Sequence, residues 1–182
     1  RKSLRLKSRL TLTSRVIINM SLLLTFGGTA VIFILETLAG HDYGGSGTNL
    51  LAAFFQSVTC RTAGFNTVSI SHMSTAALVF MIFLMFIGGS PGSCAGGIKT
   101  TTARVLASFV KNRFSPGHQI TIGKRAANPT TLNNAITLLI FALLAVSAAV
   151  FILLISESGK AGADVDHRLF LNVLFETVSA FG

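Results

Sequence analysis

A polar loop in the first half of the chain has residue types suited to binding a cation through its backbone. The loop follows an apolar segment, within the motif FFQSVTCRTAGFNT, and comprises Cys60, Arg61, Thr62, Ala63, Gly64 and Phe65. Irregular backbone at membrane depth persists only where it is buried in protein or lines water, and its carbonyls can then replace the hydration shell of an ion. An ordinary outer loop built from turn residues has the same composition, so both interpretations stay open at this point.

A second motif, GGSPGSCAGG, interrupts an apolar stretch that begins at Ala76. Its residues are Gly88, Gly89, Ser90, Pro91, Gly92, Ser93, Cys94, Ala95, Gly96 and Gly97. The glycines cannot sustain a regular helix, because each costs about 1 kcal/mol relative to alanine, and the proline removes a backbone donor. A segment so weakly committed to helix can switch between blocking and open positions, which predicts a gate. A static kink that lets helices pack closely is the alternative.

Two other kinds of chemistry fit the second motif less well. Gly92 to Thr100 loosely resembles a phosphate-binding loop, but that pattern needs glycine directly before lysine, and Ile98 precedes Lys99. Ser90 or Ser93 could serve as the nucleophile of an intramembrane serine protease, but the chain has no G-x-S-x-G motif. The nearest histidine lies in a predicted outer loop, and the histidines show no metal-ligand spacing. We therefore expect a protein that is not an enzyme.

The composition is that of a membrane protein. Of the 182 residues, 51% are apolar and 12% are charged, whereas about 25% are charged in an average soluble domain. The chain is therefore too apolar to be disordered and has too few charges to cover a soluble globule. Its net charge of +9 could indicate nucleic-acid binding, but no aromatic residues are interleaved with the basic ones to stack on bases. We expect no nucleic-acid partner.

The apolar runs and the charges define the elements that position the two motifs. Residues 16–38 and 135–155 are each long and apolar enough to form a transmembrane helix. The first run is too long for a signal peptide and lacks a small-residue cleavage site. Basic residues gather in segment 1–15 and around the linker 111–130, which places both on the cytoplasmic side. Residues 75–110 are predicted to form an inner helix that the glycine-rich loop breaks.

Two shorter apolar segments reach only half-way across a bilayer. Residues 49–67 are predicted to form a re-entrant pore helix with its loop, and residues 169–182 the start of a second such unit. Phe55-Gln56-Ser57-Val58-Thr59 aligns with Phe175-Glu176-Thr177-Val178-Ser179 at an offset of 120 residues, which indicates an internal repeat. A half-span helix that dips from outside points the negative end of its dipole at the membrane centre, where it favours a cation.

The motifs resemble those of one transporter superfamily. FFQSVTCRTAGFNT is similar to the third pore loop of the Trk/Ktr/HKT superfamily of potassium transporters, GGSPGSCAGGIKTTT to the broken inner helix that follows it, and FETVSAFG to the start of the fourth pore loop. The resemblance implies an all-α membrane protein made of membrane–pore–membrane repeats, as in potassium channels. The chain would hold the third repeat and the start of the fourth, whose filter glycine would lie beyond Gly182. Cys60 and Cys94 stand where the superfamily is expected to have a small or hydroxyl residue.

The resemblance also implies a function, which is potassium uptake through a filter of backbone carbonyls. Gly64 takes the place of the filter glycine, and K⁺ would be held at Thr62, Ala63 and Gly64 with the carbonyl of Arg61 beside them. Loop 88–97 takes the place of a gate below the filter. No cofactor is expected on this chain; K⁺ is the transported ion and Na⁺ a possible coupling ion.

The expected partners follow from the same resemblance. They are membrane lipid, a second copy of the full-length chain in a homodimer, and a cytoplasmic nucleotide-binding regulatory ring that docks on the Lys99–Arg125 face. The expected location is a bacterial cell membrane, which the chain crosses several times. A secondary transporter with discontinuous helices, specific for another small substrate, is the alternative that the broken helices leave open.

Two basic residues next to the motifs need a separate interpretation. A charge at membrane depth is costly, so Arg61 is expected to bond to the back of the filter or to an acid of a neighbouring repeat. A position in outer water is the alternative. Lys99 closes the broken helix and is expected to be a cytoplasmic anchor whose amine reaches the membrane interface.

Overall fold

The chain is helical almost throughout the part that the computed structural model describes, which is residues 11–42, 45–113, 121–122, 125–126, 129–158 and 169–182. Its α-helices are α1 (Leu12–Leu38), α2 (Ser46–Thr59), α3 (Thr75–Phe86), α4 (Thr100–Arg113), α5 (Pro129–Ser158) and α6 (Leu169–Phe181). A single 3-10 turn, Ile70–His72, precedes α3. The predicted all-α class therefore holds for these residues, with one small addition. Strands β1 (Thr121–Ile122) and β2 (Arg125–Ala126) form a short antiparallel pair within the predicted linker.

Two predicted segments fall largely outside the described residues. They are most of the basic segment 1–15 and much of the linker 111–130. Their predicted cytoplasmic position remains a prediction.

Hydroxyl side chains cap the N-termini of two helices. The Thr11 hydroxyl accepts the Ser14 N–H at 3.2 Å at the start of α1, and the Ser74 hydroxyl accepts the Ala77 N–H at 3.2 Å at the start of α3. Each satisfies one of the N–H groups that have no partner within the helix. Helix α3 ends at Phe86, directly before the glycine-rich motif.

Helices α1 and α5 are long and apolar enough to cross a membrane. They contain 27 and 30 residues, so at a rise of about 1.5 Å per residue each exceeds the roughly 30 Å hydrocarbon core of a bilayer. Most of their surface is exposed, including the large apolar side chains of Phe26, Ile34, Phe151 and Ile155. Such apolar surface needs cover from lipid or from further protein.

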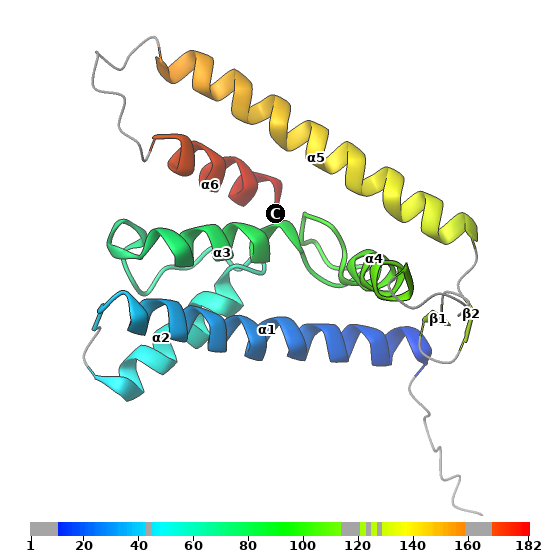
Figure 1. Ribbon diagram of the computed structural model, residues 1–182, viewed down its shortest axis with the longest axis horizontal. Coiled ribbons are helices and arrows are strands. Elements are labelled where there is room, and N and C mark those ends of the chain that lie inside the picture. The colour runs from blue at the N-terminus through cyan, green and yellow to red at the C-terminus, as the bar shows by residue number, and fades with distance from the viewer. Residues whose placement is uncertain (1–10, 43–44, 114–120, 123–124, 127–128, 159–168) are drawn as a thin grey trace, which may run out of the picture.

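Helix α3 lies at the centre of the arrangement. Figure 1 shows α3 and α6 side by side between the long helices α1 and α5, and α2 packs obliquely against α1. The core centres on α3, where Ala77, Met81 and Leu84 are buried, together with Ile32 of α1 and Val178 of α6. This packing holds the ends of α2, α3 and α6 close together.

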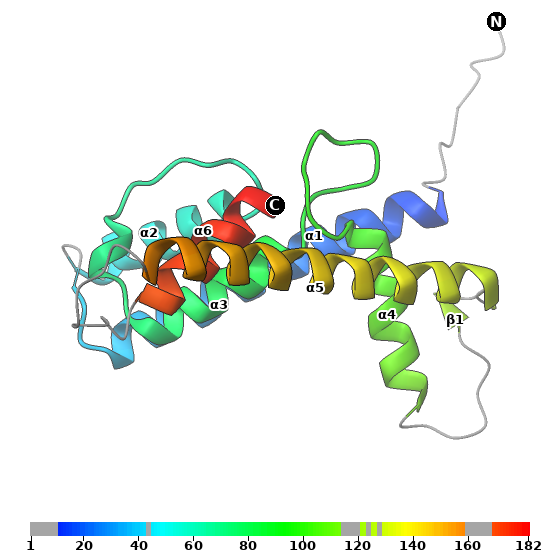
Figure 2. The same cartoon turned by 90° about the horizontal axis from the view of Figure 1, so that it is seen from above.

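Helix α4 does not continue the line of α3. Residues 87–99 have no regular helix or strand, and α4 then runs across the direction of α1 and α5, as the two views in Figures 1 and 2 show. The glycines and Pro91 release the backbone from helical geometry, so contacts with α1 and α5 set the direction of α4. The segment predicted as one broken inner helix is therefore two helices of different direction.

Candidate functional site

A hydroxyl group closes the polar loop that follows α2. The Thr59 hydroxyl accepts the Phe65 N–H at 2.9 Å and donates to the Phe65 carbonyl at 2.5 Å. At the same time the N–H groups of Arg61 and Ala63 bond to the carbonyls of Val58 and Thr59 at 3.0 and 3.2 Å, which tightens the last turn of α2. Hydrogen bonds thus hold residues 60–65 in a closed loop, and its tip, Thr62 to Gly64, is exposed.

Two residues at the tip of this loop have left-handed backbone conformations. Thr62 has φ 70° and Gly64 has φ 75°. Glycine adopts this conformation freely, whereas a β-branched residue such as threonine is strained there by about 1–3 kcal/mol. Strain of this kind is stored where the surrounding structure imposes it, and it concentrates at functional sites. The conformation of the tip therefore marks it as a candidate binding segment.

Arg61 is held against α1. Its side chain is half-buried, and Nη1 and Nη2 donate to the Ser21 carbonyl and hydroxyl oxygens at 3.3 and 3.2 Å. The guanidinium of Arg61 is thus bound by the backbone carbonyl and the hydroxyl of Ser21 in α1. These bonds keep the guanidinium charge beside α1 instead of on the tip of the loop.

Further hydrogen bonds fasten α2 itself to α1. The Ser57 hydroxyl, which is fully buried, donates to the Thr25 carbonyl at 2.8 Å and lies 3.3 Å from the Leu24 carbonyl. The aromatic rings of Phe26 and Phe54 also meet across this contact, with centroids 6.3 Å apart. The helix that carries the polar loop is therefore anchored along one face.

The glycine-rich loop is closed at its base by backbone hydrogen bonds. The Ile98 N–H bonds to the Phe86 carbonyl at 3.1 Å, and the Thr100 N–H bonds to the Gly89 carbonyl at 3.1 Å. Gly88 and Gly89 at the base are buried, whereas the residues from Pro91 to Cys94 at the tip are exposed. The loop is therefore a compact excursion between α3 and α4, and Figure 2 shows it projecting from the helices.

Lys99 stabilises the inside of this loop. Its Nζ donates to the Ser93 carbonyl at 3.3 Å and also to the Ala95 carbonyl. The amine supplies donors that the irregular backbone of the loop lacks. This contact was not expected from the sequence, where Lys99 is predicted only as a cytoplasmic anchor, and that role remains a prediction.

The same loop docks on the end of α6. The N–H groups of Gly96 and Gly97 donate to the carbonyls of Gly182 and Phe181 at 2.8 and 3.0 Å, which satisfies acceptors that a helix C-terminus leaves free. The rings of Phe86 and Phe181 stack beside this contact, with centroids 5.7 Å apart. A Cβ at Gly96 would lie 2.5 Å from both carbonyl oxygens, so only glycine allows the approach. The glycine-rich loop and the end of α6 are thus in direct contact.

Two neighbouring cavities lie where these segments meet. One, of about 490 Å³, is lined by Arg61 and Thr62 of the polar loop, by Gly182, and by Gly89, Ser90, Ser93, Cys94 and Ala95 of the glycine-rich loop. The other, of about 190 Å³, includes Thr59, Thr62 and Gly64 in its lining together with Ser179 and Gly182. Because Thr62 and Gly182 line both, the polar loop, the glycine-rich loop and the end of α6 surround adjoining space.

The environment of Ser90 and Ser93 does not resemble a protease site. The Ser93 hydroxyl donates to the Ser90 carbonyl at 2.6 Å. The residues that line the adjoining cavity, in the part of the chain that the structure describes, include no histidine to act as a base. Lys99, which a phosphate-binding loop would present to its ligand, is instead bonded to loop carbonyls.

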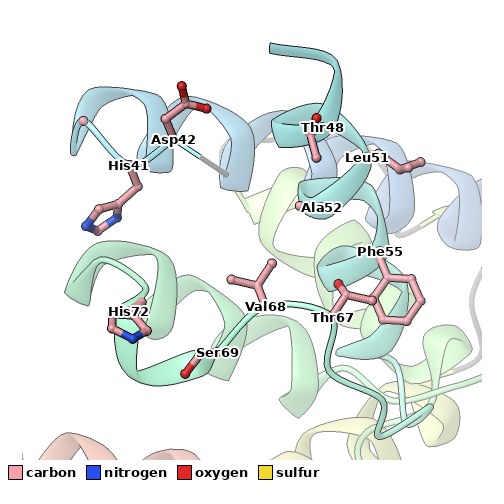
Figure 3. Close-up of a pocket in the computed structure, with 11 residues that line it drawn as sticks. His41, Asp42, Thr48, Leu51, Ala52, Phe55, Thr67, Val68, Ser69 and His72 are labelled. Carbon is pink, nitrogen blue, oxygen red and sulfur yellow. The ribbon is translucent and has the colours of Figure 1, made fainter. Parts of the chain in front are cut away.

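A wider pocket of about 750 Å³ lies between α2, the chain that follows α1 and the chain that precedes α3. Figure 3 shows Leu51 and Phe55 of α2 on one side of it and His41 and His72 on the other. Its lining mixes apolar side chains with histidine, aspartate and hydroxyl groups. The pocket shares no residue with the two cavities at the tip of the polar loop.

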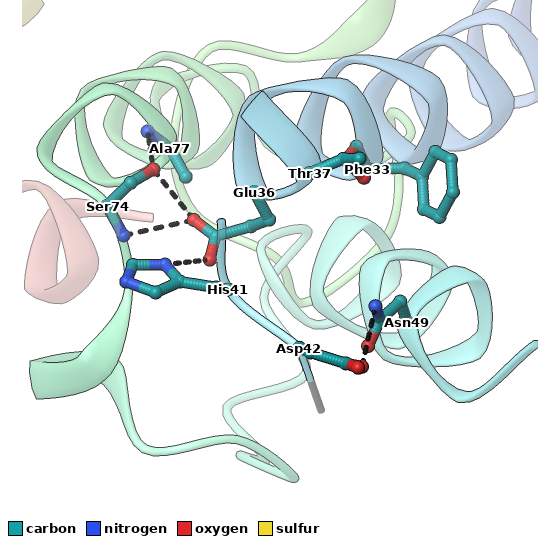
Figure 4. A network of polar contacts seen from close by, with 8 residues as sticks. All are labelled: Phe33, Glu36, Thr37, His41, Asp42, Asn49, Ser74 and Ala77. Carbon is teal, nitrogen blue, oxygen red and sulfur yellow. Dashed lines mark hydrogen bonds and ion pairs between the residues drawn. The ribbon is translucent and has the colours of Figure 1, made fainter. Parts of the chain in front are cut away.

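A buried carboxylate joins the end of α1 to the start of α3. Glu36 accepts the Ser74 N–H and hydroxyl at 3.0 and 2.7 Å, and its other oxygen lies 2.8 Å from His41 Nδ1 (Figure 4). Ser74 is the residue that caps α3, so the carboxylate also lies at the positive end of that helix. This network ties the end of α1 to the start of α3.

The structure brings together most of the site residues predicted from the sequence, and it adds others. Cys60 is buried behind the loop, Thr62 to Phe65 are exposed on it, and the glycine-rich loop lies across the cavity from them. Sequence reasoning missed Thr59 and Ser21, which hold the polar loop. The only signal for them was a hydroxyl group inside or at the end of an apolar helix, and such groups are common.

Comparison with known proteins identifies the family to which these segments belong. Residues 4–182 match the cation transport protein family TrkH. The chain is 33% identical over 175 residues to the potassium/sodium uptake protein NtpJ of Enterococcus hirae, which covers 96% of this chain and 38% of that protein. The members of the family are described as transport proteins and not as enzymes.

Two relatives from Bacillus subtilis are similar to a comparable degree. The Ktr system potassium uptake protein B is 33% identical over 189 residues, which covers 100% of this chain and 38% of that protein. The Ktr system potassium uptake protein D is 38% identical over 169 residues, with 87% of this chain and 34% of that protein covered. The chain therefore spans about a third of the length of the curated relatives it matches.

Proposed function

Because the chain belongs to the TrkH family of cation transport proteins, we propose that it forms one part of a membrane pathway for potassium uptake. The observation that carries this proposal is the meeting of the polar loop, the glycine-rich loop and the end of α6 around two adjoining cavities. Relatives named as potassium uptake proteins support the choice of ion.

The proposed architecture is a membrane–pore–membrane repeat followed by the start of another. The order of a long helix followed by a short helix occurs twice, as α1 with α2 and as α5 with α6. Thr59 and Ser179 occupy equivalent positions in the 120-residue repeat, and both line the smaller cavity. Two equivalent helix ends that face one space are what a pore with repeat symmetry requires.

In the proposed mechanism, K⁺ loses water at a ring of carbonyls to which this chain contributes Thr62, Ala63 and Gly64. Thr59 and Arg61 fix the loop from behind, so its carbonyls need no reorganisation when the ion arrives. The ion then enters the cavity that the glycine-rich loop lines. Other parts of the full-length protein supply the remaining sides of the ring, and Na⁺ is a possible coupling ion.

The glycine-rich loop is proposed to be the gate, and its docked position the closed state. Its bonds to Phe181 and Gly182 hold it beside the cavity below the polar loop. Apart from these bonds and the hydrogen bonds at the base of the loop, few contacts hold its exposed tip. Only a few hydrogen bonds must therefore break for the loop to leave α6.

The proposed setting is a bacterial cell membrane that the full-length chain crosses several times, with lipid against α1 and α5. The Ktr relatives are named as parts of a system, which supports a transporter that works with other subunits. A cytoplasmic nucleotide-binding ring is proposed to dock on the Lys99–Arg125 face, where Arg104 and Lys111 of α4 are exposed. A homodimer of full-length chains is the proposed assembly.

The test is growth at low K⁺ of a bacterial strain that lacks its own potassium uptake systems, carrying the full-length protein. Gly64→Ser is expected to abolish rescue, because a side chain at φ 75° strains the loop although open space surrounds it. Gly27→Ala, also surrounded by open space but inside helix α1, is the control and should rescue growth. Unchanged rescue and selectivity in Gly64→Ser would remove Gly64 from the filter.

A further inference from the structure

Gln56 has a buried side-chain amide without a hydrogen-bond partner among the residues that the structure describes. The residue is 1% exposed, and neither Nε2 nor Oε1 bonds to any described residue. Burying an amide in this way costs free energy comparable to a lost hydrogen bond, and native proteins almost always avoid it. The position is sensitive, because the Gln56 carbonyl accepts the Cys60 N–H at 3.1 Å in the last turn before the polar loop.

The amide borders a small cavity between α1, α2 and the chain that precedes α3. The cavity has a volume of about 10 Å³, close to what a single water molecule needs. Apolar residues such as Ile32 and Met73 line part of it, and the polar residues Glu36 and Asn49 line another part. Cavities that remain empty in proteins are apolar, whereas this one, although mostly apolar, has the Gln56 amide and the polar side chains of Glu36 and Asn49 in its lining.

The chemistry of the amide selects the occupant. Oε1 needs a donor and Nε2 needs an acceptor, and water can be either, whereas a metal cation could bind only Oε1. The nearby Glu36 carboxylate already accepts bonds from Ser74 and lies against His41, so it does not leave a bare negative charge for a cation. A neutral occupant that both donates and accepts fits best.

We propose that one ordered water molecule occupies this cavity and binds the Gln56 amide, so that it fastens the last turn of α2 to α1 and to the chain before α3. The other hydrogen-bond partners of the water are polar groups that line the cavity. Ser57 and Arg61 hold α2 to α1 directly, and the water adds a third attachment one turn before the loop. The inference concerns the folding of this repeat and stands whether or not the transported ion is K⁺.

Thermal unfolding of the purified full-length protein in detergent tests the proposal through Gln56→Met, which keeps the length of the side chain and removes both polar atoms. If water bridges the amide, the Tm of Gln56→Met falls by several degrees, because the water loses a partner. An equal or higher Tm would overturn the proposal, because removing an amide from a dry cavity relieves its desolvation cost. Leu51→Met, at a 68% exposed position of the same helix, is the control and should leave the Tm unchanged.

A measurement on the wild-type protein keeps the proposal testable if Gln56→Met does not fold. A high-resolution density map should show a peak at about 2.7–3.2 Å from Gln56 Oε1 or Nε2, and an empty cavity in such a map would refute the proposal. Where Gln56→Met folds, the difference in Tm between the wild-type protein and Gln56→Met should be the same in sodium chloride and in choline chloride at equal ionic strength. A stabilisation specific to Na⁺ that Gln56→Met abolishes would assign the cavity to Na⁺ instead of water.

Discussion

Single hydrogen-bonding groups, and not packing, hold the polar loop in its strained shape. The Thr59 hydroxyl bonds to both backbone groups of Phe65, and Arg61 reaches Ser21 on the neighbouring helix. The tip between them is exposed, so little else opposes the strain at Thr62. The conformation of the tip should therefore depend on these two attachments.

Thr59→Val keeps the shape of the side chain but removes the hydroxyl from the loop of the full-length protein. The Phe65 N–H and carbonyl then lose their partner, which should destabilise the protein by about 1–3 kcal/mol. We expect a lower Tm and a smaller ratio of Rb⁺ to Na⁺ uptake in proteoliposomes. Thr59→Ser restores the hydroxyl and should recover both; a Thr59→Val protein with wild-type selectivity would show that the attachment does not shape the pathway.

At the scale of elements, the contact between the glycine-rich loop and α6 joins two segments that lie more than eighty residues apart in the chain. Hydrogen bonds from two glycine N–H groups and the stack of Phe86 on Phe181 make this contact. The absence of a side chain at Gly96 is what allows the close approach. The contact is thus specific enough to be broken by one methyl group.

Gly96→Ala introduces a Cβ that would lie 2.5 Å from the carbonyl oxygens of Phe181 and Gly182, so the loop must move away from α6. If the docked loop is the closed state, ⁸⁶Rb⁺ uptake by the full-length protein without any activating partner should rise severalfold. Cys94→Ala changes an exposed residue of the same loop and should leave uptake at the wild-type level. Lower uptake in Gly96→Ala would mean that the docked position is the conducting one.

Particular elements show how far the sequence can predict the fold and the site. The end of α3 at Phe86 and the start of α4 at Thr100 follow from glycine and proline, which act locally. The direction of α4 does not follow, because contacts with α1 and α5 decide it. The attachment of Lys99 to the carbonyls of Ser93 and Ala95 was likewise hidden, since it depends on how the loop folds back on itself.

At the scale of the whole molecule, the described helices form an incomplete enclosure. The smaller cavity is lined by the first polar loop and by the end of α6, which provide two sides of a space. Large apolar side chains are exposed along α1 and α5, and the relatives are about three times as long as this chain. Further segments of the full-length protein are therefore expected to complete the pathway and to cover part of this surface.

Uptake of ⁸⁶Rb⁺ into proteoliposomes is the measurement that tests this account most directly, with the 182-residue chain compared with the full-length protein at equal reconstituted amounts. The full-length protein is expected to take up ⁸⁶Rb⁺, with excess K⁺ competing, whereas the 182-residue chain alone should not exceed empty liposomes. Uptake by the shorter chain alone would contradict the account, because copies of this chain would then form the pathway without further repeats. Absence of uptake by the full-length protein would contradict the potassium pathway itself.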